Sequence, residues 1–409
     1  MSTFRLYLRQ AMRRSIWVSA ASVLIVAGCG ATSTGNAHSA KSPIKIGIEY
    51  SQSGVLASLA TPSAQAAELA IQQANAHGGI DGHPIAVTVE DTTSNPSTAA
   101  QDAHALVQDG VNVVLGTATG GDCRAAAPIL EAAQVLQFCW SNQVFKGPGQ
   151  PEGSGPQLNK FFFESQYPVS QYPQTVASWL EARNIHTIGI IETVGPVATA
   201  SASIFIAAEK LDPGLKIIST QSFASGDTNI SAQMTVLKAA NPDLIEAGTS
   251  GSDIIPVVEA MNALGMKQPL YVSTGSAIQS ILTQVKHIIV PGGMYSASAW
   301  VDLPGYMPQT ASNYAQVQSF VKAYQAKYNA VPGEVEAAGY DSAQQVITAL
   351  RAGARTGAQI SAYLTSHTFT GVLGTYHYTT TNHQPLALVP LMMSFGANGR
   401  FQLAYEPSK

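Results

Sequence analysis

The sequence predicts an α/β protein built from two doubly wound layers, each a parallel sheet covered by helices on both faces. Strand-like and helix-like segments alternate over residues 44–142 and again over residues 186–285. The strand-like segments are short apolar runs such as Ile44-Lys45-Ile46-Gly47-Ile48. Apolar strands that alternate with amphipathic helices indicate parallel sheets buried on both faces.

The first layer is best marked by its first helix. Ala67, Ala70, Ile71 and Ala74 recur at the spacing of one helix face, and His77-Gly78-Gly79 ends the pattern. We expect strands at 44–48, 85–90, 111–115 and 135–139, and helices at 62–76, 96–108 and 123–133.

The second layer is expected to begin at Phe161-Phe162-Phe163, after a loop rich in Gly and Pro at 146–160. We expect strands at 186–192, 216–223, 244–247 and 270–273, and helices at 171–183, 200–211, 230–240, 254–264 and 276–285. Residues 291–304 are predicted to be a connection. Two long helices, 311–328 and 336–352, are expected to dock on the first layer, and short hairpin-like strands are expected after Gly371.

The first 29 residues have the pattern of an export signal. Four Arg residues precede an apolar run at 16–27, which is too short to span a bilayer. The run ends in Val26-Ala27-Gly28-Cys29, which resembles a bacterial lipobox and predicts lipidation of Cys29. The alternative is an ordinary signal with a chance Cys. Residues 30–42 are rich in small residues and predict a flexible tether.

Composition and charge exclude several classes of protein. The 409 residues favour two domains, 45% are apolar, and only 11% are charged. The formal charge is −4, and without the leader 17 basic residues stand against 25 acidic ones, which gives −8. A mildly acidic surface argues against binding to nucleic acid or to an anionic membrane.

Two cysteines remain in the body, Cys123 and Cys139. Outside the cytoplasm, paired cysteines are the more common state. Cys123 is expected to start a helix and Cys139 to end the next strand, so both lie at one sheet edge, where a disulfide is geometrically possible. Two buried free thiols, or a reactive thiolate at Cys123 opposed by Asp122, are the alternatives.

The sequence carries no pattern of a catalytic or metal site. Nine His residues are scattered without metal-ligand spacing, and no Gly-x-Ser-x-Gly elbow is present. The Gly-rich turn at 116–121 lacks the Gly-Lys-Ser/Thr of a phosphate loop. We therefore expect neither enzymatic activity nor a cofactor or metal.

Several phrases together resemble one family. They are Ile46-Gly47-Ile48 with Ser53-Gly54, Ala74-Asn75-Ala76-His77-Gly78-Gly79-Ile80-Asp81-Gly82, Val89-Glu90-Asp91 with Asn95-Pro96, and Gly339-Tyr340-Asp341-Ser342. Their order and spacing resemble the type I periplasmic binding proteins, in particular the leucine/isoleucine/valine-binding proteins of branched-chain amino-acid ABC transporters. The resemblance covers about residues 43–403.

The resemblance implies two α/β lobes that are joined by three crossing strands and close on a ligand like a hinge. Lobe I would hold residues 43–160 and 296–368, and lobe II residues 161–295 and 369–409, with crossings near Lys160, Ser296 and Phe369. The implied function is that of an extracytoplasmic lipoprotein, monomeric and lipid-anchored to the bacterial cell membrane. It would capture a small polar metabolite (amino acid, amide or carboxylate) and deliver it to an ABC permease. The alternative is a sensor of the same fold that signals through a partner protein.

The ligand is expected at the carboxyl ends of the strands, where small-residue turns expose N–H groups at helix starts. The resemblance implies that the turns Thr119-Gly120-Gly121 and Ser141-Asn142-Gln143 hold a ligand carboxylate. The further predicted contacts are Ser53, Asp122, Trp140, Val197, Ser250 and Thr274. The alternatives are tight turns without ligand contact and, for Trp140, core packing.

One departure from the family leaves the ligand class open. In the amino-acid binders an acidic residue pairs with the ligand ammonium, and Thr274 stands at that position here. Tyrosines that frame the family's pocket are replaced by Leu59, Val197 and Ser250 or Gly251. Asp122 could substitute for the missing acid, although it can also cap its helix or pair with Arg124. An α-amino acid, an amide, a carboxylate or an apolar molecule therefore remains open.

Overall fold

The structure is a computed structural model that describes residues 41–54, 56–141, 160–168, 171–194, 196–288, 290–385, 390–396 and 398–406, without the side chains of 196–200. Ala40–Lys409 form one compact unit. The strands described there form sheets of five, seven and two strands. Within these ranges, no helix is both long and apolar enough to cross a membrane. The predicted leader and Cys29 lie outside the described residues.

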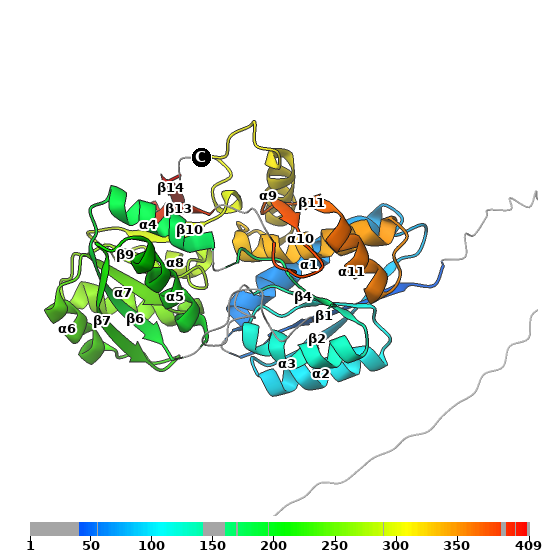
Figure 1. Ribbon diagram of the computed structural model, residues 1–409, viewed down its shortest axis with the longest axis horizontal. Coiled ribbons are helices and arrows are strands. Elements are labelled where there is room, and N and C mark those ends of the chain that lie inside the picture. The colour runs from blue at the N-terminus through cyan, green and yellow to red at the C-terminus, as the bar shows by residue number, and fades with distance from the viewer. Residues whose placement is uncertain are drawn as a thin grey trace, which may run out of the picture. The chain divides into compact units, whose positions relative to one another are not determined.

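The first sheet is entirely parallel and has the order β2-β1-β3-β4-β5. Its strands are β1 (Ile44–Tyr50), β2 (Ile85–Asp91), β3 (Val113–Gly116), β4 (Leu136–Cys139) and β5 (Phe162–Glu164). Its helices are α1 (Ala57–Ala76), α2 (Pro96–Gln108), α3 (Gly120–Ala132), α9 (Tyr314–Tyr328), α10 (Glu334–Arg351) and α11 (Gly357–Ser366). Figure 1 shows α1 and α10 on one face of the strands and α2 and α3 on the other. We call this part the first lobe.

The apolar stripe predicted for the first helix is confirmed. Ala67, Ala70 and Ile71 of α1 are buried in one cluster with Ile46 and Ile48 of β1. The helix starts five residues earlier than expected, because it continues through Pro62. The other face of the sheet forms a separate small cluster under α2 and α3. Apolar side chains on both faces are what a buried parallel sheet requires.

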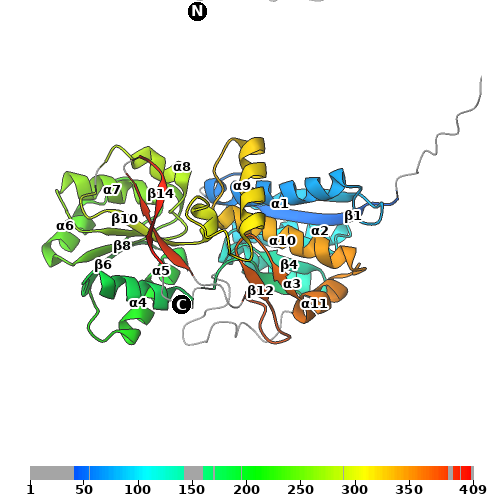
Figure 2. The same cartoon turned by 90° about the horizontal axis from the view of Figure 1, so that it is seen from above.

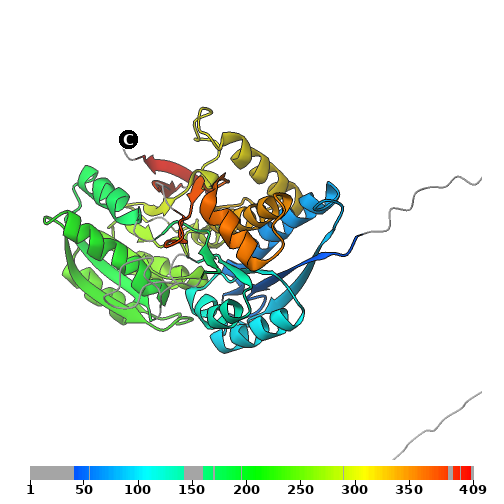
Figure 3. The same cartoon turned by 45° about the vertical axis from the view of Figure 1, so that its right-hand side comes forward.

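The two long helices dock on the first lobe, as predicted. Gly339 of α10 crosses α1 so closely that a Cβ atom at this position would lie 2.1 Å from the Ser63 carbonyl oxygen. Only glycine permits that approach. The Tyr340 hydroxyl bonds to Gln73 Oε1 at 2.7 Å, and the Tyr328 hydroxyl donates to the Gln65 carbonyl at 2.8 Å. Figure 3 shows the orange helices beside the blue α1.

The second sheet has the order β14-β13-β10-β9-β8-β6-β7. Its strands are β6 (Thr187–Thr193), β7 (Lys216–Phe223), β8 (Leu244–Gly248), β9 (Leu270–Val272), β10 (Met294–Ser298), β13 (Leu391–Phe395) and β14 (Phe401–Tyr405). The helices are α4 (Tyr172–Ala182), α5 (Pro196–Leu211), α6 (Ser231–Ala240), α7 (Ile254–Ala263) and α8 (Gln279–Leu282), with 3-10 turns at Gly251–Asp253, Thr283–Val285 and Trp300–Asp302. Figure 2 shows α4 and α5 on one side of the strands and α6 and α7 on the other. We call this part the second lobe.

Parallel pairing extends from β7 to β10, and the C-terminal hairpin is antiparallel to it. β13 pairs antiparallel with β10, and β14 with β13. β11 (Thr368–Thr370) and β12 (Thr375–His377) form a separate antiparallel pair. The predicted hairpin-like arrangement after Gly371 is therefore confirmed, and the predicted α/β class holds for both lobes.

Two expectations about the strands are wrong. Phe161-Phe162-Phe163 do not begin the second layer, because β5 pairs in parallel with β4 and completes the first sheet. The centres of the Phe163 and Phe138 rings lie 5.6 Å apart, and this contact packs β5 against β4. The connection predicted at 291–304 contains β10, an internal strand of the second sheet. The helix expected at 276–285 is reduced to α8 and a 3-10 turn, and α11 was not predicted.

The β11–β12 hairpin belongs with the first lobe by its contacts. Asp341 of α10 accepts hydrogen bonds from the Val372 and Leu373 amides at 2.8 and 2.9 Å. The Tyr378 hydroxyl donates to the carbonyl of Glu164, the last residue of β5, at 2.9 Å. These contacts bring the turn after β11 and the residue after β12 to the first lobe. The expected crossings near Lys160, Ser296 and Phe369 and the lobe boundaries stay predictions.

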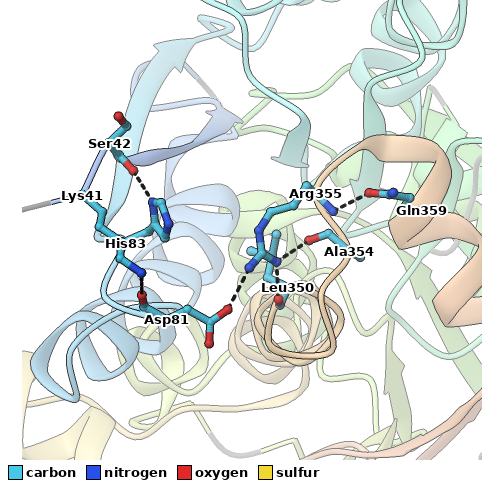
Figure 4. A network of polar contacts seen from close by, with 8 residues as sticks. All are labelled: Lys41, Ser42, Asp81, His83, Leu350, Ala354, Arg355 and Gln359. Carbon is cyan, nitrogen blue, oxygen red and sulfur yellow. Dashed lines mark hydrogen bonds and ion pairs between the residues drawn. The ribbon is translucent and has the colours of Figure 1, made fainter.

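A polar network ties the start of β1 to the helices of the first lobe (Figure 4). Arg355 pairs with Asp81 at 2.8 Å and donates to the Leu350 carbonyl at the end of α10. Lys41 donates to the Asp81 carbonyl at 2.8 Å, and His83 Nδ1 lies 2.7 Å from the Ser42 carbonyl. A cation at a helix C-terminus satisfies carbonyls that lack intrahelical partners.

The disulfide predicted between Cys123 and Cys139 is present, with an S–S distance of 2.00 Å. It joins the first turn of α3 to the end of β4. Both cysteines are fully buried, with Ala127 and Phe162 around them. The bond therefore braces two of the turns that follow strands of the first sheet.

We predict that removing this disulfide destabilises the protein. A closed loop of this length stabilises by about 2–4 kcal/mol, because it restricts the unfolded chain. The double substitution C123S/C139S should lower the free energy of unfolding by that amount in urea denaturation. C29S, which removes the third Cys, is the matched control. Equal denaturation midpoints for the two proteins would contradict the prediction.

A second prediction concerns Glu246, a fully buried carboxyl on β8. Burial, opposed by the hydrogen bond from Ser201 and assisted by nearby Glu192, raises the pKa of Glu246 to about 8. Because the folded state holds this proton more tightly than the unfolded chain, the free energy of unfolding falls as the pH rises from about 4.5 to about 8.

The variant E246Q should remove this part of the pH dependence. It should resemble the native protein at about pH 5 and exceed its free energy of unfolding by more than about 1 kcal/mol at about pH 8.5. E181Q, at an exposed position of α4, is the control. Urea titrations at both pH values measure the effect. The prediction is wrong if the free energy of unfolding changes with pH equally in the native protein and in E246Q.

Candidate functional site

The carboxyl ends of strands from both sheets border one small cavity. Residues that follow β3 and β4 meet residues that follow β8 and β9. The cavity has a volume of about 40 Å³, and we call it the cleft cavity. Its lining consists of Leu59, Ser63, Ala118, Thr119, Trp140, Ser141, Gln166, Ser250, Thr274, Gly275 and Val335. This is the edge at which open parallel sheets bind ligands.

On the first lobe, the wall is the start of α3. Thr119 is its N-cap, and its hydroxyl oxygen accepts the Asp122 amide proton at 3.3 Å. The first turn of a helix leaves further N–H groups without intrahelical partners, here those of Gly120 and Gly121. These N–H groups and the helix dipole favour a carboxylate or another hydrogen-bond acceptor beside Thr119.

Trp140 is part of the core and also of the wall. Its side chain is 1% exposed, and the indole N–H donates to the Ser342 hydroxyl at 2.9 Å. Ser342 lies on α10, so this bond joins the end of β4 to a helix distant in sequence. Trp140 therefore packs in the core, which was the alternative interpretation, and it also lines the cavity.

On the second lobe, the wall is a pair of turns held together by hydrogen bonds. The Thr249 and Ser276 hydroxyls lie 2.9 Å apart, and the Gly251 amide donates to the Gly275 carbonyl at 2.9 Å. Next to them, the Ser250 hydroxyl is buried and has no partner among the described residues. A buried hydroxyl without a partner carries a desolvation cost that a polar ligand can relieve.

Other predicted contacts lie away from the cavity or outside the described residues. Ser53 is exposed, and its hydroxyl donates to Asp91 at 2.8 Å. Asp122 lies buried in the first turn of α3 and accepts a hydrogen bond from Thr92 at 3.2 Å. Burial raises the pKa of Asp122, and the hydrogen bonds from Thr119 and Thr92 oppose the rise.

Gly120 and Gly121 start α3 without lining the cavity. Val197 lies in α5, where its side chain is not described. Asn142 and Gln143 are outside the described residues. Ligand contact by all twelve predicted residues stays a prediction.

Six lining residues were not among the predicted contacts. They are Leu59, Ser63, Ala118, Gln166, Gly275 and Val335. Ala118 and Gly275 lie in the turns 117–122 and 273–276, to which the rule of strand ends does point. Leu59 stands where the resemblance places a tyrosine of the pocket. Gln166 follows β5, and Val335 opens α10; neither follows a strand that the sequence had placed at this edge.

A larger cavity of about 370 Å³ adjoins the first and shares Thr274 and Val335 with it. A cavity needs about 10–15 Å³ to hold one water, so the cleft cavity holds only a few waters. Small-molecule sites commonly measure roughly 300–1,000 Å³. A solute in the cleft therefore needs the lobes to separate or needs the adjoining space as well. No cluster of three or more His, Cys, Asp or Glu suited to a metal occurs in the part of the chain that is described.

Two parallel-sheet lobes that share a cavity at their strand ends define a bilobed solute-binding protein. The family model of the periplasmic binding proteins matches residues 43–396, so the chain belongs to that family. The resemblance noted in the sequence is thereby confirmed.

Individual relatives are more distant. The chain is 24% identical over 303 residues to Leu/Ile/Val-binding protein homolog 7 of Brucella suis, covering 72% of this chain and 73% of that one. Homolog 8 of the same organism is 24% identical over 343 residues, covering 81% and 82%.

Solved structures show the same fold. The branched-chain amino acid transporter substrate-binding protein LivJ from Streptococcus pneumoniae, solved with isoleucine, has a TM-score of 0.72 and 24% identity, with 89% of this chain and all of that one covered. A type 1 periplasmic binding protein from Bordetella pertussis has a TM-score of 0.77 and 22% identity, with the same coverage.

We predict that W140F destabilises the protein more than W179F does. Both indoles are 1% exposed, but the Trp179 N–H has no partner among the described residues, whereas Trp140 donates to Ser342. W140F loses side-chain volume and also a hydrogen bond, and the lost bond lowers the free energy of unfolding by about 1–3 kcal/mol. W179F loses the same volume but removes a donor that has no partner. Urea denaturation of both variants compares them, and a larger loss for W179F would refute this reading.

Proposed function

We propose that the protein is an extracytoplasmic solute-binding lipoprotein of an ABC transporter. It captures a small polar metabolite, of the amino acid, amide or carboxylate type, between two hinged lobes and delivers it to a permease. The observation that carries the proposal is the cleft cavity. Thr119 and Ser141 approach it from the first lobe, and Ser250 and Thr274 from the second.

A solute in this position would bond to both lobes at once. Its acceptor atoms would meet the start of α3 on one side and the Ser250 hydroxyl on the other. A ligand that contacts both lobes binds the closed arrangement more tightly than the open one, and this difference in affinity stabilises the closed arrangement. The closed arrangement is then the form that a permease can distinguish from the free protein.

The leader and the relatives support the cellular part of the proposal. Lipidation at Cys29 would anchor the chain to the membrane, and residues 30–42 would tether the body to that anchor. The relatives bear the name of Leu/Ile/Val-binding proteins, and LivJ was solved with isoleucine. We propose that the protein is a monomer. We also propose that it binds its solute without chemical turnover, since the lining of the cleft cavity carries no carboxyl, His or Cys side chain.

A thermal-shift screen of the full-length protein tests the proposal. The panel holds amino acids, amides, short carboxylates and aromatic acids. A solute at 100 times its dissociation constant stabilises by roughly 2.7 kcal/mol, which raises the Tm measurably. S250A should weaken the response, because it removes a hydroxyl of the cavity wall, and S231A on the exposed start of α6 should not.

Two results would contradict the proposal. One is a panel in which no solute raises the Tm of the native protein. The other is a solute that stabilises the native protein and S250A equally, together with equal stabilisation in T274A, because such a solute would bind elsewhere. Uptake assays with and without the protein then separate transport from binding alone.

A further inference from the structure

The larger cavity beside the cleft cavity has an unusual wall. We call it the Glu334 cavity; its volume is about 370 Å³. Its lining includes three carboxyls, those of Asp302, Glu334 and Glu336, and the two tyrosines Tyr324 and Tyr328. Thr274 and Val335 line both this cavity and the cleft cavity, so the two spaces are adjacent.

Glu334 brings an unpaired oxygen to this wall. Its side chain is 7% exposed, and Oε1 accepts a hydrogen bond from the Tyr172 hydroxyl at 2.9 Å. Oε2 accepts no hydrogen bond from the described residues. Burial, with Asp302 adding its charge, raises the pKa of Glu334 to about 8. The carboxyl is thus held in place and desolvated, with half of its acceptor capacity unused.

The two neighbouring carboxyls are buried in the same way, and Asp302 accepts more hydrogen bonds than Glu334 does. Glu336 is 6% exposed and accepts the Gly333 amide proton at 2.9 Å. Asp302 accepts from the Ser298 hydroxyl at 2.9 Å and from the Glu334 amide at 3.3 Å. Within the described ranges, no Lys, Arg or His forms an ion pair with any of the three. Three close carboxyls without a cation are costly to ionise.

The aromatic wall suits a cation as well. The Tyr324 and Tyr328 rings lie 4.7 Å apart, and the Tyr328 hydroxyl points to α1 by donating to the Gln65 carbonyl. The Lys327 ammonium lies 5.4 Å from the centre of the Tyr328 ring, so this ring already accommodates a nitrogen cation. Aromatic faces beside carboxylates are a favourable setting for an ammonium or guanidinium group.

We propose that the Glu334 cavity binds the cationic end of the solute, which is therefore a molecule with an amine or guanidine group, as basic amino acids have. The acceptor end of the same molecule lies in the cleft cavity, beside Thr119 and Ser250. The inference rests on the proposed function, since it assigns a ligand class to the same site. The cation supplies the positive charge with which none of the three carboxyls is paired. Glu334 Oε2 accepts a hydrogen bond from an N–H of this cation.

Titration calorimetry of the full-length protein with L-lysine and L-norleucine tests the assignment. Norleucine has the lysine skeleton without the terminal ammonium. Lysine should bind at least about tenfold more tightly, because its ammonium pairs with a buried carboxyl and stabilises the ionised form of that carboxyl. L-Arginine is the second cationic probe.

The variants E334Q and E336Q should abolish this preference. Glutamine can still accept from the Tyr172 hydroxyl or from the Gly333 amide, so each substitution keeps the structural bond and removes the charge. E181Q on the surface of α4 is the matched control and should keep the preference. If one of the two variants does not fold, the other carries the test, because the two residues hold different structural bonds.

The outcomes separate this inference from the proposed function. Norleucine or leucine binding as tightly as lysine, or a lysine preference that persists in both E334Q and E336Q, overturns the cationic assignment and leaves solute binding intact. Failure of lysine and arginine to bind also overturns it. If, in addition, no solute of the wider panel raises the Tm, the proposed function falls with it.

Discussion

Parallel pairing is the constraint on which the rest of the structure depends. In the first lobe β1 lies between β2 and β3, and in the second lobe β6 lies between β7 and β8, so that both sheets wind outward in two directions from an internal strand. All parallel strands of a sheet end at one edge, and the helices that follow begin there. Gly116 makes one such turn possible: its φ of +121° and a backbone approach that leaves no room for a Cβ exclude other residues.

The strands and most helices could be predicted because their signals are local. Buried parallel strands are apolar along their whole length, as in β3. The helix α2 has its predicted bounds, because Asn95 and Pro96 mark the start, and the Asn95 side chain accepts the Ser97 amide proton at 2.8 Å. α11 also has a local signal that was missed, the capping box of Thr356 and Gln359. β5 and β10 could not be assigned to their sheets from the sequence, because partners far away in the sequence place them.

The candidate site shows the same division. Thr119, Trp140, Ser141, Ser250 and Thr274 were predicted from their positions after strands, and the structure brings all five to one cavity. Ser53 follows β1 as well, but its hydroxyl turns to Asp91. Gln166 follows β5 and Val335 lies in the first turn of α10, and tertiary packing brings both to the cavity. The carboxyls of Asp302, Glu334 and Glu336 come from a 3-10 turn and from the start of α10, so no local pattern in the sequence predicts that they line one cavity.

The contact between α1 and α10 holds in place part of the wall that the two cavities share. The Ser63 hydroxyl donates to the Val335 carbonyl at 2.9 Å, and Gly339 locks the two helices together one turn further on. Val335 borders both cavities, so their shared wall is fixed before any solute arrives. A preorganised wall loses little conformational entropy on binding. Discrimination between solutes of different length then depends on the fit to a rigid surface, because neither helix can adjust separately.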